Sequence, residues 1–233
     1  MRRVVNQSID DRSAASRPGL ALAVLAGSFG VVSVSLSVMN VVFDALVEEF
    51  SGTSTATLGW VLTGYTTMTA ALLIAAGRIA DAYGRKRTFL AGLAVFVVAS
   101  IVGALAWNPA IIIVARVGQG AGSALVIPTS LALLLVIYPS TKRSSVIGVW
   151  GAVGAVAAAG GPAIGGLVVD TLGWRWVFWF NVPLCALTWL AARRWLEADE
   201  GDSDAGAPDA LGIFLSAVAV GALALGLAQS GDW

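Results

Sequence analysis

The fold is decided by a short basic segment that lies between two long apolar runs. The segment reads Gly77-Arg78-Ile79-Ala80-Asp81-Ala82-Tyr83-Gly84-Arg85-Lys86-Arg87, and the apolar runs beside it cover residues 57–76 and 88–107. Each run has about 20 residues, the length that an α-helix needs to cross the hydrocarbon core of a bilayer. The pattern predicts two membrane-spanning helices joined by a basic loop.

Further apolar runs of similar length follow along the chain, at residues 19–42, 110–137, 146–169, 176–195 and 210–228. They are apolar on all faces, as suits lipid or a bundle interior, and each is too long for a buried strand. The sequence therefore predicts an all-α integral membrane protein. We expect a cytoplasmic tail (1–18), a six-helix bundle (19–196), an acidic cytoplasmic linker (197–209) and a seventh transmembrane helix (210–233), where the chain is truncated.

The composition excludes several classes of protein. The 233 residues are 58% hydrophobic and only 12% charged, with a mean hydropathy of +0.83, whereas soluble domains carry about 25% charged residues. The chain has no histidine and one cysteine, Cys185, which rules out His-dependent triads, an internal disulfide and a Cys-only metal site. We expect a protein that is not an enzyme, with no catalytic residues and no metal site.

The basic residues predict how the chain is oriented. All but two of the 14 Lys and Arg residues fall in segments that would face one side, the exceptions being Arg116 within a span and Arg175 in an opposite loop. Cytoplasmic segments carry an excess of Lys and Arg. The pattern predicts a multi-pass protein of the plasma membrane with a cytoplasmic N-terminus.

Residues 77–87 resemble the G-x-L-A-D-R-x-G-R-K signature of the major facilitator superfamily. Four further segments resemble motifs of that family in the same order: residues 60–65, residues 116–122, the glycines of residues 151–166, and residues 174–178 with Asn181 and Pro183. The predicted linker and seventh helix resemble the fourteen-helix drug:proton antiporter branch, of which this chain looks like the N-terminal half.

The resemblance implies a secondary active transporter that exports drugs or other amphipathic small molecules by alternating access. It would use the proton gradient as its energy source and no cofactor. Its implied partners are the lipid bilayer, a small-molecule substrate, protons, and a second copy or a missing C-terminal half, with no nucleic acid. The alternative is a truncated, non-transporting fragment. A membrane enzyme and a retinal-type photoreceptor are disfavoured, because the predicted spans lack catalytic carboxylates and a lysine.

A gating role is implied for Gly77, Asp81, Gly84, Arg85 and Lys86. Gly77 would let a helix end approach a neighbour, and Gly84 would permit the positive φ of a tight reversal. Asp81 would accept hydrogen bonds from a helix N-terminus or pair with Arg85. The simpler interpretation, a basic loop that only fixes the topology, explains the cations but not the two glycines.

Arg116 is predicted to face a cavity or a partner, because an arginine inside a span costs about 2.5–3.5 kcal/mol on insertion scales. The alternative is that its side chain snorkels to the outer interface. The resemblance places Arg116, Gln119 and Gly120 on the coupling and transport path. All acidic residues lie in predicted loops or at span ends. The spans therefore lack the buried carboxylate that proton coupling normally uses, unless Asp44, at the edge of the first span, serves Arg116.

The fifth predicted span resembles the antiporter motif through Gly151, Gly154, Gly161, Pro162, Gly165 and Gly166. Small residues allow close helix packing in lipid, with Gly161, Gly165 and Gly166 on or near one face, and Pro162 is expected to bend the helix. The resemblance implies that this helix seals the inner half of the path. Asn40, Tyr65 and Trp150 are the candidate groups of a substrate cavity.

Overall fold

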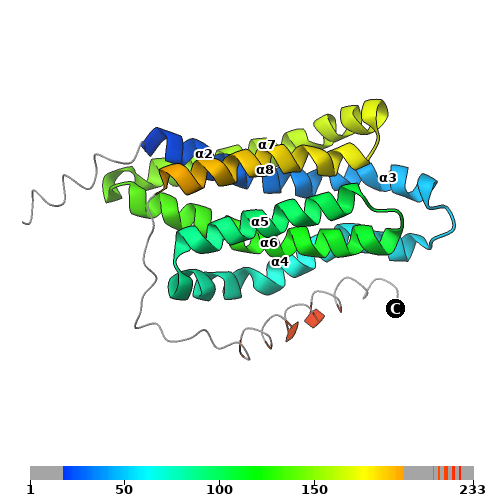
Figure 1. Ribbon diagram of the computed structural model, residues 1–233, viewed down its shortest axis with the longest axis horizontal. Coiled ribbons are helices and arrows are strands. Elements are labelled where there is room, and N and C mark those ends of the chain that lie inside the picture. Colours follow the sequence, from blue (N-terminus) through cyan, green and yellow to red (C-terminus); the bar gives the residue numbers. More distant parts are fainter. Residues whose placement is uncertain are drawn as a thin grey trace, which may run out of the picture.

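The computed structural model describes residues 18–196 and single residues between 212 and 226. The predicted all-α fold is confirmed over this part of the chain. Its elements are α2 (Pro18–Ser37), α3 (Met39–Glu49), α4 (Thr55–Tyr83), α5 (Arg85–Ala104), α6 (Pro109–Ile137), the 3-10 turn η1 (Ser140–Lys142), α7 (Arg143–Leu172) and α8 (Arg175–Trp195) (Figure 1). Residues 1–17 of the predicted tail and the predicted linker lie outside the described residues. So does the predicted seventh helix, except for the helical positions Gly212, Leu215, Val218, Ala219, Ala222, Leu223 and Gly226.

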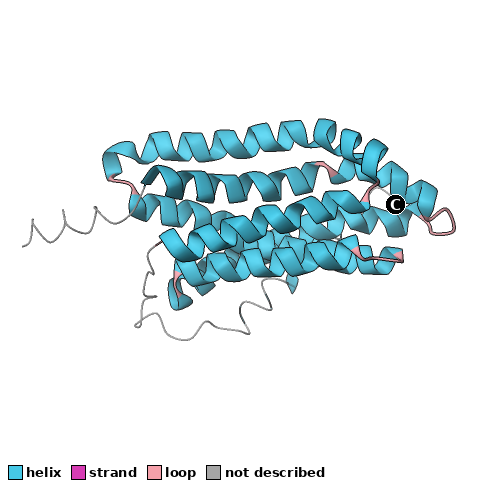
Figure 2. Cartoon of the chain, turned by 45° about the horizontal axis from the view of Figure 1, so that its top comes forward, coloured by secondary structure: helices cyan, strands magenta, loops and turns pink. Residues whose placement is uncertain are grey.

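The helices pack side by side into a bundle, with the connections at its two ends (Figures 1 and 2). The start of α2, the α4–α5 and α6–α7 connections and the end of α8 lie at one end. The α3–α4, α5–α6 and α7–α8 connections lie at the other. The end that holds the α4–α5 and α6–α7 connections therefore carries the described basic residues of the predicted cytoplasmic segments.

Within the described residues, five segments are long and apolar enough to cross a membrane: Pro18–Glu49, Thr55–Tyr83, Arg85–Ala104, Pro109–Ile137 and Ser140–Leu172. The first combines α2 and α3, because Val38 between them keeps helical dihedral angles (φ −61°, ψ −28°). The predicted span 176–195 forms α8 but falls outside this set, since its tryptophans and arginines lower its mean hydropathy. α8 packs against α5 and α2. The chain is a multi-pass membrane protein.

The predicted loop at residues 77–87 is wrong over most of its length. α4 continues to Tyr83 and α5 begins at Arg85, so Gly84 is the one non-helical residue between them. Polar side chains do not stop a helix, and only Gly84 supplies the left-handed backbone (φ 92°) that reverses the chain. The positive φ expected at Gly84 is confirmed.

Two apolar clusters fill the interior, one toward each end of the bundle. The first contains Leu25, Phe89, Phe96 and Leu134. The second contains Met39, Leu46, Val61, Ile112 and Phe178. On α2, α5 and α6 the residues between the two clusters include buried polar side chains, among them Ser35, Ser100 and Arg116. The apolar core is therefore divided by a polar layer.

Candidate functional site: a buried polar layer around Arg116

The polar layer combines side chains from five helices, and we refer to it as the Arg116 layer. Its members are all buried, with exposed fractions of 5% or less: Ser35 (α2), Tyr65 (α4), Ser100 (α5), Arg116, Gln119 and Ser123 (α6), and Asn181 (α8). On α6 the three residues are spaced at 3 and 4 positions, which places them on one face of the helix. That face points into the bundle.

Arg116 lies at the centre of the layer with 0% of its surface exposed. Its Nε donates to the carbonyl oxygen of Val61 (3.0 Å), and its Nη1 donates to the carbonyl of Ser35 (3.2 Å) and to Gln119 Oε1 (2.8 Å). The guanidinium carbon lies 4.3 Å from the centroid of the Tyr65 ring, within the range of a cation–π contact. The side chain therefore faces partners inside the bundle, and the snorkelling alternative is wrong.

The charge of Arg116 has no acidic counterpart in the described part of the chain. Asp44 is exposed on α3 and makes no ion pair with Arg116, so the expectation that it serves the arginine is wrong. α3 carries Asp44 toward the end of the bundle, about 1.7 helical turns beyond Val38. Arg116 Nη2 is buried and makes no hydrogen bond to any described residue. A donor in that position is costly to leave unpaired.

The layer is a connected network rather than a set of separate bonds. Gln119 Nε2 donates to Ser100 Oγ (2.9 Å), which in turn donates to the carbonyl of Phe96 (2.7 Å). The Tyr65 hydroxyl donates to the carbonyl of Val32 (3.1 Å) and lies 2.6 Å from Ser123 Oγ. Because that hydroxyl has one proton, Ser123 is the donor of the second bond. These bonds hold α6 to α2, α4 and α5.

Gly120, predicted on the transport path, is required by close packing. A Cβ at this position would lie 2.5 Å from the carbonyl oxygen of Tyr65 and 3.1 Å from Met68 Cβ. Thr69 Oγ1 also donates to the Gly120 carbonyl (3.1 Å). The residue lets α4 and α6 approach each other beside Arg116, so its contribution to the site is to fix the position of the arginine.

The glycines of α7 separate into two groups. Gly154, Gly161 and Gly165 are buried against α2, where a Cβ would collide with Phe29, Ser37 and Val38 respectively. A Cβ at Gly151 would meet nothing within 4 Å, and one at Gly166 would make only an ordinary contact of 3.8 Å with Val41. The expected packing face is therefore present at Gly161 and Gly165 and absent at Gly166. Pro162 is exposed inside a continuous helix.

The structure does not bring the three candidate cavity residues together. Trp150 stacks on Phe29 (centroids 3.9 Å apart) and donates to Ser130 Oγ (3.2 Å), so it packs α7 against α2 and α6. Tyr65 belongs to the Arg116 layer. Asn40 is exposed, donates to the carbonyl of Ser37 (3.1 Å), and borders a small cavity of about 230 Å³. No hydrogen bond or ring contact between described residues joins any two of the three.

The residues predicted for gating also serve different purposes. Lys86 Nζ donates to the carbonyl oxygens of Arg193 (3.2 Å) and Leu196, at the end of α8. Asp81 is exposed and forms no ion pair with Arg85 or any other described residue. A Cβ at Gly77 would meet nothing within 4 Å, so the expected close helix contact there is wrong. The expected Asp81–Arg85 pair is absent because the two lie on different helices separated by the reversal at Gly84.

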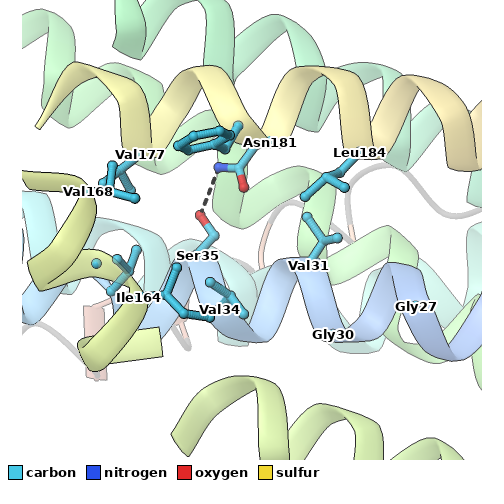
Figure 3. A pocket seen from close by; sticks show the side chains of 13 residues that line it. Gly27, Gly30, Val31, Val34, Ser35, Ile164, Val168, Val177, Asn181 and Leu184 are labelled. Carbon is cyan, nitrogen blue, oxygen red and sulfur yellow. Dashed lines mark hydrogen bonds between the residues drawn. The ribbon is translucent and has the colours of Figure 1, made fainter. Parts of the chain in front are cut away.

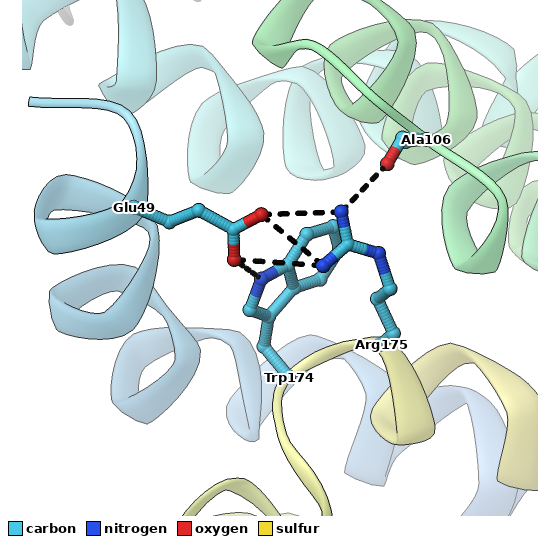
Figure 4. A network of polar contacts seen from close by, with 4 residues as sticks. All are labelled: Glu49, Ala106, Trp174 and Arg175. Atoms are coloured by element: carbon cyan, nitrogen blue, oxygen red, sulfur yellow. Dashed lines mark hydrogen bonds and ion pairs between the residues drawn. The ribbon is translucent and has the colours of Figure 1, made fainter. Parts of the chain in front are cut away.

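At the opposite end of the bundle, a polar clamp joins three connections (Figure 4). Arg175 forms an ion pair with Glu49 (3.1 Å) and donates to the carbonyl of Ala106 (3.1 Å). Trp174 Nε1 donates to the same carboxylate (2.5 Å), and the Arg175 guanidinium lies over the Trp174 ring at 4.3 Å. The clamp ties the end of α3 to the starts of α6 and α8.

Ser35, Ser100, Ser123 and Asn181 were not among the predicted site residues. Their signal in the sequence is a polar residue inside an apolar run, but serine occurs often in such runs because it can bond to its own helix, as Ser28 and Ser33 do here. Only the arrangement of the helices shows which serines meet Arg116 or its partners.

Comparisons with known proteins agree with this architecture. The family model described as Major Facilitator Superfamily matches residues 20–231. The chain is 43% identical over 176 residues to the "Drug efflux pump JefA" of Mycobacterium tuberculosis, covering 74% of this chain and 34% of that protein. It is 37% identical over 215 residues to the "Methylenomycin A resistance protein" of Bacillus subtilis (91% and 46%). It is 35% identical over 210 residues to the "Tetracenomycin C resistance and export protein" of Streptomyces glaucescens (90% and 39%).

The chain thus spans 34% to 46% of the length of these relatives. The family match covers almost all of the chain and includes every described helix. The chain belongs to the Major Facilitator Superfamily.

Proposed function

We propose that the chain is the N-terminal part of a secondary active exporter of drugs or other amphipathic small molecules, and that it works by alternating access. The proposal is supported by the names of the relatives, which are drug efflux, antibiotic resistance and export proteins. We place it in the plasma membrane with a cytoplasmic N-terminus, since the predicted inner segments carry the basic residues. We also assign it to the fourteen-helix branch.

Arg116 is the observation on which the proposal rests. A buried cation without a carboxylate partner lowers stability, so its presence inside a bundle points to a functional use. Its Nη2 has a free N–H that can donate to an anionic or carbonyl group that enters the layer. Coupling to the proton gradient would need a titratable acid, which the described helices do not place beside Arg116. We therefore propose that the carboxylate comes from a part of the full transporter outside residues 18–196.

The test is ethidium accumulation in an efflux-deficient bacterial host that expresses the 233-residue chain. Arg116→Gln removes the charge, and Gly151→Ala serves as the matched control because its Cβ enters open space. At equal membrane expression, we expect the chain and the control to lower accumulation. Arg116→Gln and a protonophore should each return accumulation to the empty-vector level.

The second candidate is a fragment that inserts into the membrane but does not transport. It is favoured by the length of the chain, which is less than half that of the relatives. Accumulation equal to the empty vector for all three proteins would support this alternative. The Arg116→Gln comparison would then be repeated in the longer transporter.

A further inference from the structure

One feature of the bundle that the Arg116 layer does not explain is a cavity of about 460 Å³ between α2, α7 and α8 (Figure 3). α7 and α8 both pack on α2 but make much less contact with each other, which leaves space above α2. Gly27 adds to this space because it places no side chain there. The walls are mostly aliphatic, with contributions from Val31, Val34, Val168 and Leu184.

Two polar side chains form the floor of this cavity. Asn181 Nδ2 donates to Ser35 Oγ (3.4 Å) (Figure 3). Asn181 Oδ1 accepts no hydrogen bond from any residue between 18 and 196, although the side chain is only 5% exposed. Both residues line the cavity. A carbonyl oxygen in an apolar cavity is stabilised by a ligand that donates a hydrogen bond.

The mouth of the cavity is apolar and lies within the length of the helices. Ile164, Phe180 and Leu184 are 54%, 42% and 49% exposed and stand at the rim. Ile164 lies eight residues before the end of α7, or about 12 Å along a helix that rises 1.5 Å per residue. Because α7 is a candidate membrane span, this opening faces the hydrocarbon region of the bilayer.

Ser35 connects the cavity to the buried charge. Its hydroxyl lies on the cavity floor beside Asn181, while its carbonyl oxygen accepts the bond from Arg116 Nη1 (3.2 Å). A molecule in the cavity would thus be separated from the guanidinium by a single residue. This arrangement places the cavity and the Arg116 layer in one structural unit.

We propose that this cavity binds a neutral, mainly apolar small molecule that enters from the membrane and donates one hydrogen bond to Asn181 Oδ1. The volume is within the range of small-molecule sites, which are usually apolar with a few placed polar groups. A lipid acyl chain would fill the walls but leave the amide oxygen unsatisfied. The inference rests on the proposed function and names one class of substrate for it, beside cationic substrates such as ethidium.

The test compares two ring systems that differ by a single donor, 1-aminoanthracene and anthracene. Binding of each tritiated probe is measured by scintillation proximity on the full chain in lipid nanodiscs, against nanodiscs without protein. We expect saturable binding of both, with 1-aminoanthracene bound about five- to tenfold more tightly because of one buried hydrogen bond. Asn181→Leu should remove this preference and leave anthracene binding unchanged.

Two further variants separate the cavity from other sites. Leu184→Trp fills the rim while keeping both Asn181 and Ser35, and it should abolish saturable binding of both probes. Val98→Trp, on α5 and 61% exposed, is the matched control and should leave both unchanged. Equal affinity for the two probes in the wild-type chain, or saturable binding that survives Leu184→Trp, overturns the proposal.

The experiments distinguish a failure of the cavity proposal from a failure of the proposed export function. Nanodisc binding needs neither a gradient nor export. A chain that exports ethidium but shows no saturable binding of 1-aminoanthracene would refute only the cavity. A chain that shows the expected binding but does not lower ethidium accumulation would refute only the proposed activity.

Discussion

The contact between α2 and α7 makes a sharp prediction, because neighbouring glycines of one motif should respond in opposite directions to the same substitution. At Gly154, a Cβ would collide with three atoms of the Phe29 ring, Cε1, Cδ1 and Cζ. The ring cannot move away freely, since it is stacked on Trp150 at 3.9 Å with an interplanar angle of 10°. At Gly151, the same methyl group enters open space.

The magnitudes follow from these contacts. Gly154→Ala gains about 0.5–1 kcal/mol from better helix propensity. It loses about 1–3 kcal/mol from overpacking, and about 0.5–1.5 kcal/mol more if the aromatic stack is displaced. With both losses, the free energy of unfolding should therefore fall by about 0.5–4 kcal/mol, whereas Gly151→Ala should raise it by about 0.5–1 kcal/mol. At about 2–4 °C per kcal/mol for a chain of this size, Tm should fall by about 1–16 °C for Gly154→Ala and rise by about 1–4 °C for Gly151→Ala.

The assay is thermal unfolding of both variants in the same nanodisc preparation. Phe29→Leu supplies the third corner of a double-mutant cycle, since a smaller side chain removes the collision. Gly154→Ala should cost little in the Phe29→Leu background. Equal Tm shifts for Gly151→Ala and Gly154→Ala, or no rescue by Phe29→Leu, would refute the placement of α7 on α2.

Three further predictions concern polar contacts. Arg116→Met should lower the free energy of unfolding by about 1–3 kcal/mol, because Gln119 Oε1 loses its donor. Combining Arg116→Met with Gln119→Leu should restore it to within about 1 kcal/mol of the wild type. Thermal unfolding of the two variants measures the difference. Lys86→Met removes the donor to the Leu196 carbonyl, so amide exchange in the last turn of α8 should accelerate about two- to fivefold, as measured by mass spectrometry. Arg175→Met should lower the free energy of unfolding by less than about 1 kcal/mol, and by less still at high salt, because the Arg175 side chain of the ion pair is 42% exposed. A fall in Tm of more than about 5 °C at either salt concentration would contradict this.

The helices could be predicted from the sequence because length and apolarity decide whether a segment can cross a bilayer. The boundaries could not, because they depend on where polar side chains are tolerated. The basic pattern predicts a loop at Arg78 and Asp81, yet both belong to α4, because a helix satisfies its backbone whether its side chains are in lipid or water. Gly84 was predictable for a different reason, as only glycine readily adopts the conformation found there.

Arg116, at the centre of the candidate site, could be predicted from the sequence, whereas its hydrogen-bond partners could not. An arginine within a span signals a functional position on energetic grounds alone, and Arg116 is indeed buried among partners. Its partners Ser35 and Val61 contribute carbonyl oxygens, which leave no signal in the sequence. The same limit applies to the glycines of α7, where Gly151 and Gly154 are alike in sequence and only the register against α2 separates them.

The distribution of hydrogen bonds indicates which helix is least firmly held. The Arg116 layer joins α2, α4, α5, α6 and α8 through side chains. In the described part of the chain, α7 shares one side-chain hydrogen bond with another helix, from Trp150 to Ser130. It meets α2 through the stack of Trp150 on Phe29 and through glycine contacts. Van der Waals contacts between small residues permit sliding more readily than directional bonds do. α7 also forms one wall of the large cavity. A displacement of α7 along α2 would therefore change the cavity while leaving Arg116 and its bonded partners in place.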